Sequence, residues 1–542
     1  MTRDETITPE LTDAQWERLT AIGTTQDVDE GDYVFRSGDA DYDLIVVEEG
    51  EIEIVRDALK WVDEVVISRM GPRTFAGELG LLNGQGAFLS ARATGPGRVR
   101  RITRTELRRL MNEDDDLCDL ILHALWARRE SLRNGPAAMT LKFVGYSSSS
   151  DFLALRRFAE RLDLVHVAVA VPPDGIEYLV GHSIPEENLP LAFIQGEPLP
   201  RATPGAVAER LGLSYQAQAD EVVDLVVVGG GPAGLAAAIY GASEGLSTVL
   251  LDAVAPGGQA AATSRIENFL GFPFGVSGGE LIGQATLQAL KFGVRVYAPC
   301  EAVGLSTVDG GQELDVTLSD GRLIRARAAV ITSGAAYRRL ALDRWSDFER
   351  AGIYYAATPL ELRQVTGEPV VVVGGANSAG QAALYLAAGG SPVDLVVRGD
   401  DLSARMSSYL VDRLVEEPRI RIHRGSRVVG LGGDTSLASV TIDSVGEVDA
   451  RGLFCFIGAD PATSWVPTLD RDPEGFIRTG TDIALQSLQR WQTLGREPLP
   501  FETSIPRVFA AGDVRRGSMK RVAAAVGEGS SAVASVHRAL AG

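Results

Sequence analysis

The order of apolar and polar residues divides the chain into three regions with different predicted folds. In residues 1–135, short segments read as alternating apolar and polar positions, such as 44–47 and 52–55, are separated by glycine turns and predict a small antiparallel β-roll, followed by a helix over about 116–132. Residues 140–215 alternate strands with helices, which predicts a small α/β domain joined to the rest by a polar linker over 212–221. Residues 222–542 contain two strand–glycine turn–helix patterns, which predict two nucleotide-binding lobes.

The first glycine-rich turn has the spacing of a dinucleotide-binding loop. An apolar strand leads into Gly229, Gly231 and Gly234, and an apolar helix follows. In such a loop the first glycine permits a tight turn, the second lets the backbone approach a pyrophosphate, and the third lets the helix pack on the strand. The next strand ends in Asp252, at about the spacing of ~20 residues at which a carboxylate binds a ribose hydroxyl.

The second glycine-rich turn follows the strand 370–373 and has alanine in place of the middle glycine. Its residues are Gly374, Ala376, Asn377, Ser378 and Ala379. The next strand ends in Arg398 rather than in an acid, and an arginine favours the 2′-phosphate of NADPH. The alternative is a lobe that no longer binds a nucleotide.

Residues 222–542 resemble bacterial thioredoxin reductases through the motifs Pro-Gly-Gly-Gln (256–259), Ile-Glu-Asn (266–268), Gly-Phe-Pro (271–273) and the segment 506–514. The resemblance implies a Rossmann-type module with an FAD-binding first lobe (222–340 and 465–542) and an NADPH-binding second lobe (350–464). It also implies that the flavin or its ribityl chain contacts Gln259, Asn268, Gly512, Asp513, Lys520, Arg521 and Val522.

The redox cysteines of that family are missing here. Its Cys-Ala-Thr-Cys motif aligns with 356–359, where Ala356 and Pro359 stand in place of the cysteines. A disulfide reductase of this class needs thiolates to accept electrons and to attack a disulfide. The remaining cysteines, Cys118, Cys300 and Cys455, are far apart in sequence, and we interpret Cys300 and Cys455 as core residues. We therefore assign no catalytic side chain.

The middle domain, 140–215, resembles a thioredoxin or glutaredoxin fold. Pro190 stands where that fold has its cis-proline, and 193–196 resembles the following hairpin. The position of the fold's active-site Cys-x-x-Cys reads Tyr146 followed by four serines. This domain is therefore predicted to be free of redox cysteines too, and its role stays open.

The N-terminal domain, 1–135, resembles cyclic-nucleotide-binding domains through segments 75–82 and 90–93. The resemblance implies that Glu78 binds a ribose. The arginine and serine that hold the cyclic phosphate in that family align with Ala87 and Phe88, and burial of a phosphate without a cation is costly. We expect poor binding of cAMP and cGMP. The alternatives are a structural or dimerisation domain, or a site for another ligand.

The amino-acid composition limits the kinds of partner that we expect the protein to bind. The net charge of −20 argues against nucleic acid and against an anionic membrane surface. Three cysteines suit a reducing cytosol and leave no metal-ligand pair, while the N-terminus lacks the pattern of a signal peptide. We expect a cytoplasmic homodimer whose partners are an unknown electron acceptor and, if the N-terminal site is retained, a nucleotide.

Three functional hypotheses follow. In the first, NADPH reduces FAD, which reduces a quinone, dioxygen, a small electron carrier or a partner's disulfide without an internal dithiol, under regulation by the N-terminal domain. In the second, the protein is a ligand-responsive sensor or scaffold. In the third, it is a thioredoxin-disulfide reductase that uses cysteines from elsewhere.

Overall fold

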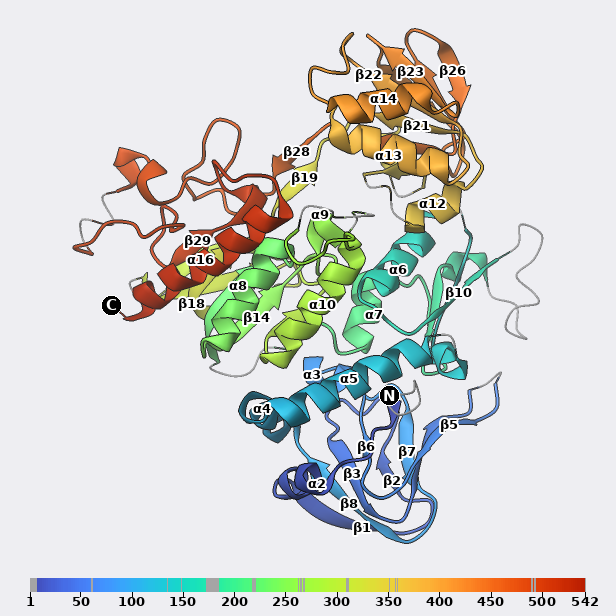
Figure 1. Cartoon of the computed structure of the whole chain (residues 1–542), viewed down its shortest axis with the longest axis vertical. Coiled ribbons are helices and arrows are strands. Elements are labelled where there is room, and N and C mark those ends of the chain that lie inside the picture. The colour runs from blue at the N-terminus through green and yellow to red at the C-terminus, as the bar shows by residue number, and fades with distance from the viewer. Residues whose placement is uncertain are drawn as a thin grey trace.

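The computed structural model describes residues 7–59, 62–133, 135–147, 149–171, 185–216, 221–261, 263, 266, 269–308, 311–349, 351–355, 357, 359–488, 491 and 494–541. Figure 1 shows the N-terminal β domain at the bottom, the middle domain above it, the first lobe in the centre and the second lobe at the top. Among the described helices, none has the length and apolarity needed to cross a bilayer.

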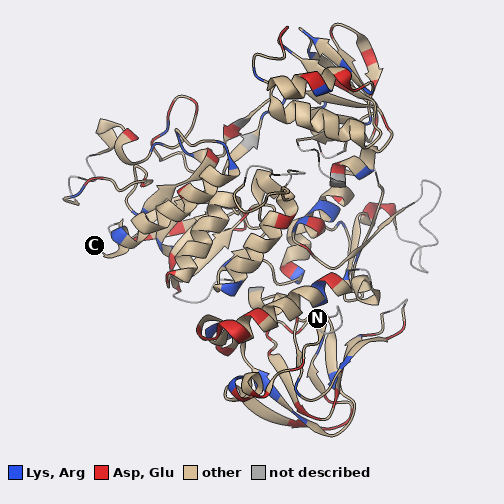
Figure 2. Cartoon of the chain, viewed as in Figure 1, with Lys and Arg blue, Asp and Glu red and all other residues tan. Residues whose placement is uncertain are grey.

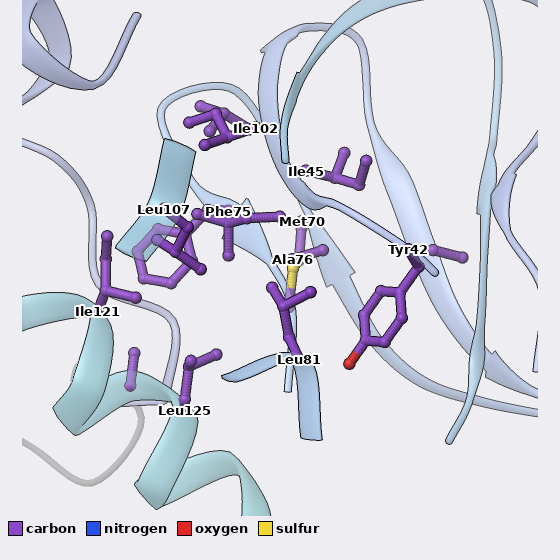
Figure 3. Packing of buried hydrophobic residues seen from close by; sticks show 14 of the residues in the cluster. Tyr42, Ile45, Met70, Phe75, Ala76, Leu81, Ile102, Leu107, Ile121 and Leu125 are labelled. Carbon is purple, nitrogen blue, oxygen red and sulfur yellow. The ribbon is translucent and has the colours of Figure 1, made fainter. Parts of the chain in front are cut away.

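The N-terminal domain is built from two four-stranded antiparallel sheets, as the sequence predicted. One sheet has the order β1 (Thr24–Val28), β8 (Gly97–Ile102), β3 (Leu44–Glu49), β6 (Phe75–Ala76), and the other β2 (Tyr33–Phe35), β7 (Ser90–Ala93), β4 (Ile52–Arg56), β5 (Val65–Met70). The helices are α2 (Asp13–Thr20), α3 (Gly80–Asn83), α4 (Arg104–Glu113) and α5 (Asp115–Leu132). Figure 3 shows how Leu107 of α4 and Ile121 and Leu125 of α5 pack with strand residues such as Phe75.

The apolar–polar alternation expected at 44–47 and 52–55 is wrong at the level of burial. All residues of β4 are buried, and so are the first four of β3. The polar residues of β4 are buried because each has partners: Glu53 accepts a hydrogen bond from Arg92 at 2.7 Å, and Arg56 donates to the carbonyl of Asp63 at 2.6 Å. These hydrogen bonds within the protein replace the hydrogen bonds that the Glu53 and Arg56 side chains would otherwise make with water.

The middle domain contains one four-stranded sheet in the order β10 (Val167–Ala170), β9 (Leu141–Gly145), β11 (Leu191–Ile194), β12 (Glu197–Leu199), flanked by α6 (Ser150–Arg161) and α7 (Pro204–Arg210). Strands β10 and β9 are parallel, whereas β11 runs antiparallel to both of its neighbours. The Leu189–Pro190 peptide is cis, as expected. The helix expected between β10 and β11 lies outside the described residues.

The first lobe is a mostly parallel sheet with the order β15 (Arg295–Tyr297), β14 (Thr248–Leu251), β13 (Val222–Val228), β18 (Leu323–Ile331), β17 (Glu313–Leu318), β16 (Ala302–Val308), and β29 (Val508–Ala510) also pairs with β18. Its helices are α8 (Pro232–Ser243), α9 (Gly258–Ala261), α10 (Gly278–Lys291) and α16 (Val522–Ala541). Gly529 lets α16 approach α8, since a Cβ at this position would lie 2.0 Å from the Ala233 carbonyl oxygen.

The second lobe has a separate parallel sheet, so the prediction of two lobes rather than one sheet is confirmed. Its order is β20 (Ile353–Tyr354), β27 (Gly452–Cys455), β21 (Val370–Val373), β22 (Val393–Val397), β23 (Ile420–Arg424). Helices α11 (Trp345–Phe348), α12 (Pro359–Val365), α13 (Asn377–Ala388) and α14 (Ser408–Glu416) and a small antiparallel sheet of β24 (Val428–Gly432), β25 (Ser439–Ile442) and β26 (Gly446–Asp449) complete it. The ribbon of β19 (Ala335–Tyr337) and β28 (Ala459–Pro461) joins the two lobes (Figure 1).

The N-terminal domain packs directly on the first lobe. Leu290 of α10 is buried within the apolar core of the N-terminal domain, with Leu287 and Val296 packed beside it. At the edge of this contact, Lys291 of α10 pairs with Asp119 of α5 at 3.0 Å. An apolar contact of this kind ties the two parts together more firmly than a surface ion pair could.

The middle domain contacts both lobes. The expected polar linker is only partly polar, because Tyr215 is buried and its ring meets Tyr297 of the first lobe edge-on at 5.2 Å. On the other side, the Arg157 guanidinium of α6 lies over the ring of Tyr354 in the second lobe, 5.5 Å from its centroid. The middle domain thus bridges the two lobes.

Candidate nucleotide-binding sites

The three glycines of the first loop have distinct surroundings. Gly229 has a φ of +110°, and a Cβ there would lie 2.3 Å from the Thr332 carbonyl oxygen. A Cβ on Gly234 would lie 1.8 Å from the Gly229 carbonyl oxygen, so this glycine is needed for helix α8 to pack on the turn. A Cβ on Gly231 would meet no protein atom within 4 Å. The space before Gly231 therefore fits a pyrophosphate at the N-terminus of α8.

Asp252 lies at the end of β14, beside the loop. One carboxylate oxygen accepts a hydrogen bond from the Gly230 N–H at 2.8 Å, and the other accepts from the N–H groups of Val254 and Ala255 at 2.9 Å each. Burial raises the pKa of Asp252. These bonds fix the carboxylate against the loop, and a carboxylate has about four acceptor positions, which leaves capacity for a ribose hydroxyl.

Segment 512–522 lies across the N-terminus of α16. Gly512 has a φ of +76°, and its N–H donates to Glu528 at 2.8 Å. Asp513 is half-buried, burial raises the pKa of its carboxyl, and within the described residues no group donates a hydrogen bond to it. A half-buried carboxylate without a donor fits a site for a polyhydroxyl chain such as the ribityl group of FAD.

The remaining residues of the predicted flavin site are distributed around this segment. The Gln259 side chain donates to the carbonyl of Ala335 in β19 at 3.1 Å. Lys520 lies over the Phe476 ring at 5.1 Å, Arg521 is exposed and Val522 begins α16. Asn268 lies outside the described residues.

The second loop repeats the tight turn of the first. Gly374 has a φ of +150°, and a Cβ on it would lie 2.5 Å from the Phe456 carbonyl oxygen. Ala376 is the N-cap residue of α13, and Asn377 accepts a hydrogen bond from the Ser407 N–H at 2.8 Å. Ser378 and Ala379 lie in the first turn of the helix. Figure 2 shows that α8 and α13 carry no charged residues, so no side-chain charge on these helices opposes the dipoles at their N-termini.

Arg398 is exposed directly after β22, and a second arginine, which the sequence did not point to, lies at the same sheet edge. Parallel pairing places Val397 of β22 opposite Arg424, the last residue of β23. Both arginines are exposed, so two cations end adjacent strands. Only the strand register brings Arg424 beside Arg398, because the two residues are far apart in sequence.

The position of the missing dithiol lies between β20 and α12. Pro359 is the first residue of α12, where proline suits a helix start, and Ala356 lies outside the described residues. Tyr355 stacks on Tyr337 with ring centroids 4.9 Å apart, and its hydroxyl donates to Glu349 at 2.8 Å. An aromatic pair thus stands beside the position that carries a dithiol in the resembling family.

The three cysteines are free and buried, as predicted for Cys300 and Cys455. Burial raises the pKa of Cys300 to about 11 and that of Cys455 to about 12, and it also raises the pKa of Cys118. Protonated, enclosed thiols of this kind are poor nucleophiles and poor electron relays.

Glu78 in the N-terminal domain is already satisfied by the protein. One carboxylate oxygen accepts from the Gly80 N–H at 2.7 Å and the other from Arg129 of α5 at 2.6 Å. The other arginines of this region are engaged elsewhere: Arg92 pairs with Glu53 and Glu64, and Arg73 with Asp13. The sequence analysis did not identify the contact between Glu78 and Arg129. The signal that could have indicated it is the pair Arg128 and Arg129, which interrupts an apolar helix face and therefore suggests buried partners.

Two family models match the chain. Residues 223–529 match the family described as pyridine nucleotide-disulphide oxidoreductase. The chain belongs to this family. Residues 25–114 match the cyclic nucleotide-binding domain, which lies within the predicted N-terminal β-roll.

Thioredoxin reductases are prominent among the relatives of this pyridine nucleotide-disulphide oxidoreductase. The chain is 31% identical to a thioredoxin reductase of Streptomyces clavuligerus over 59% of its own length and 95% of the relative's. It is also 31% identical to NADPH-dependent thioredoxin reductase 3 of Arabidopsis thaliana, over 60% of each chain. The crystal structure of Lactococcus lactis thioredoxin reductase in the FR conformation superposes with a TM-score of 0.51 at 28% identity, over 59% of this chain and 99% of that one.

Family membership confirms the predicted oxidoreductase and the predicted cofactors, since the thioredoxin reductase family uses FAD and NADPH. The predicted fusion with an N-terminal cyclic-nucleotide-binding domain is confirmed as well. The thioredoxin-like assignment of the middle domain, the domain boundaries and the individual cofactor-binding residues stay predictions.

Proposed function

We propose that the chain transfers electrons from NADPH through FAD to an acceptor without an internal dithiol. When bound, FAD accepts a hydride from NADPH and passes the electrons on. The observation that carries the proposal is the replacement of both redox cysteines by Ala356 and Pro359 in a chain whose other cysteines are buried. Both nucleotide loops meanwhile keep the geometry of binding sites, as Gly231 and Gly374 illustrate.

The residues have separate roles in this proposal. Gly231 and the N-terminus of α8 hold the pyrophosphate of FAD. Asp252 binds a ribose, and Asp513 binds the ribityl chain. The loop from Gly374 to Ala379 holds the pyrophosphate of NADPH, and Arg398 binds its 2′-phosphate. Charge-assisted hydrogen bonds make that last contact the main discriminator between NADPH and NADH.

The test is an anaerobic titration of the full chain with NADPH, followed by acceptors supplied one at a time: a quinone, dioxygen, a small electron carrier and a protein disulfide. We expect NADPH to bleach the flavin and one non-thiol acceptor to restore its colour. The triple variant Cys118→Ser, Cys300→Ser, Cys455→Ser is the control, and it should turn over at the wild-type rate. A rate that depends on these cysteines would instead support the third hypothesis, a disulfide reductase.

A sensor or scaffold is the second candidate, and the packing of the N-terminal domain against the first lobe favours it. Leu290 and Lys291 of α10 contact that domain directly, so a change there reaches the lobe that carries the FAD loop. Failure of NADPH to bleach bound flavin would favour this candidate over the enzyme. Regulation of turnover by the N-terminal domain, a homodimeric state and a cytoplasmic location belong to the proposal and await measurement.

A further inference from the structure

The N-terminal domain contains a small cavity of about 110 Å³ that is lined by Glu78, Ala87 and Phe88, the positions that align with nucleotide-binding residues of the resembling family. Its wall is mostly apolar and includes Phe35, Ile54, Met70, Ala87, Phe88 and Leu89. Small-molecule sites in proteins commonly measure about 300–1,000 Å³. The cavity is therefore much smaller than a whole cyclic nucleotide requires, and its size is closer to that of a single ring.

Among the described residues, the lining of the cavity offers no free cation for a phosphate. Arg128 is the one cation among the described residues that line it, and it is buried with hydrogen bonds to the carbonyls of Ile7, Gly77 and Phe75 at 2.8, 3.0 and 2.8 Å. Burial lowers the pKa of this guanidinium to about 10. Glu78 also lines the wall, but its carboxylate is already paired with Arg129 and the Gly80 N–H.

One polar group of the cavity wall lacks an acceptor among the described residues. Tyr42 is 2% exposed, and within the described part of the chain its hydroxyl donates no hydrogen bond, although the Glu78 backbone N–H lies near its oxygen. Figure 3 shows its ring directed inward among the buried side chains, with the hydroxyl at the inner end. A buried hydroxyl without an acceptor is destabilising, so a ligand that supplies an acceptor would gain from this group.

We propose that this cavity binds a small, uncharged, ring-sized apolar molecule that accepts a hydrogen bond from the Tyr42 hydroxyl. Apolar cavities of comparable size, about 150 Å³, bind benzene. The occupant would lie against Ser131 and Leu132 at the end of α5, the helix that also packs on α10 of the first lobe. The inference concerns the N-terminal domain alone and does not depend on the proposed electron transfer.

Calorimetry on the full-length flavoprotein tests the proposal with acetophenone and ethylbenzene, which match in size but differ by one carbonyl group. We expect acetophenone to bind more tightly than ethylbenzene. Tyr42→Phe keeps the ring and should weaken acetophenone about 3- to 10-fold, the contribution of one neutral hydrogen bond, while ethylbenzene binding stays unchanged. Ala87→Leu, which fills the cavity, should abolish binding of both.

Three results would overturn the proposal. The first is no binding of either probe at millimolar concentration to the wild-type chain. The second is an equal effect of Tyr42→Phe on both probes. The third is micromolar binding of cAMP that Glu78→Gln weakens, which would assign the site to a cyclic nucleotide. Because Tyr42→Phe removes one oxygen only, retained flavin absorbance and an unchanged melting temperature show that the variant is folded.

Discussion

Among single residues, we predict that Gly231 is the position at which FAD binding is most sensitive to change. A Cβ there meets no protein atom, so a larger side chain would point into the space where we propose that the pyrophosphate binds. We predict that Gly231→Val folds but is purified without FAD, which absorbance at the flavin band will show. Gly95→Val is the matched control, since a Cβ at Gly95 also meets nothing within 4 Å, and it should keep its flavin. A yellow Gly231→Val protein would refute the placement of the loop.

Arg398 is the residue that we expect to select NADPH. Arg398→Ala should weaken NADPH by about 10- to 150-fold, because a hydrogen bond to a charged group contributes about 1.5–3 kcal/mol, and it should leave NADH nearly unchanged. The measurement is kcat/KM of flavin reduction for both nucleotides. Arg413→Ala, at an exposed arginine of α14, serves as the control. Equal losses with NADPH and NADH would contradict the assignment.

Residue roles could be predicted from the sequence where they depend on near neighbours. The tight turn at Gly229, the packing of Gly234 and the buried cysteines follow from short segments and agree with the structure. Contacts between distant residues could not be read in this way. The pairing of Glu78 with Arg129 and the proximity of Arg424 to Arg398 depend on helix packing and strand register, which no local pattern specifies.

For the secondary-structure elements, helix α4 offers a direct test of how the N-terminal domain is held together. Thr103 and Glu106 form a capping box at its N-terminus: the Glu106 N–H donates to the Thr103 hydroxyl oxygen at 3.3 Å, and the Thr103 N–H to the Glu106 carboxylate at 3.0 Å. We predict that Thr103→Ala destabilises the helix by about 1 kcal/mol and speeds hydrogen exchange of its amides in the full chain. Thr103→Ser, which keeps the oxygen, should exchange as the wild type does.

The same capping box makes the helix sensitive to acid. Hydrogen bonds from the Thr103 side chain and backbone lower the pKa of Glu106 below its ordinary value of 4.5. The stabilisation from Glu106 is therefore fully present above that pH and is lost as the pH falls through the lowered pKa of the folded state. Exchange rates of the α4 amides between pH 6 and pH 3, corrected for intrinsic exchange, should show this loss in the wild type and a smaller loss in Thr103→Ala, which keeps the backbone N–H donor to Glu106 but not the hydroxyl.

For most elements, the sequence was enough to predict whether a segment forms a helix or a strand. It was not enough to predict where the element begins and ends or which of its side chains are buried. The helices after the glycine loops begin at Pro232 and Asn377, within the motifs themselves, because the loops continue directly into the first helical turn. The alternation expected along β4 fails for a related reason. Burial of Glu53 and Arg56 depends on partners in other strands and turns, and a pattern along one strand cannot show them.

Across the whole molecule, the middle domain limits how the two lobes can move. The Arg157 guanidinium of α6 lies over Tyr354 of the second lobe, and the ribbon of β19 and β28 is the covalent link between the lobes. We predict that NADPH changes their relative orientation and that Arg157→Ala enlarges this change, as measured by small-angle scattering with and without NADPH. Arg156→Ala is the control, because this neighbour faces Glu160 of the same helix. Identical curves with and without NADPH for the wild type and for Arg157→Ala would contradict the prediction.

The burial of Leu290 inside the core of another domain has a consequence for how this fusion can evolve. A free-standing reductase and a fused accessory domain can in principle be separated by deleting the accessory gene segment. Here such a deletion would expose Leu287 and Leu290 of α10 and Val296 of β15 to water. The shortened protein would then tend to aggregate. Compensating polar substitutions would have to arise before the deletion could be tolerated. The contact thus favours retention of the N-terminal domain independently of whether that domain binds a ligand.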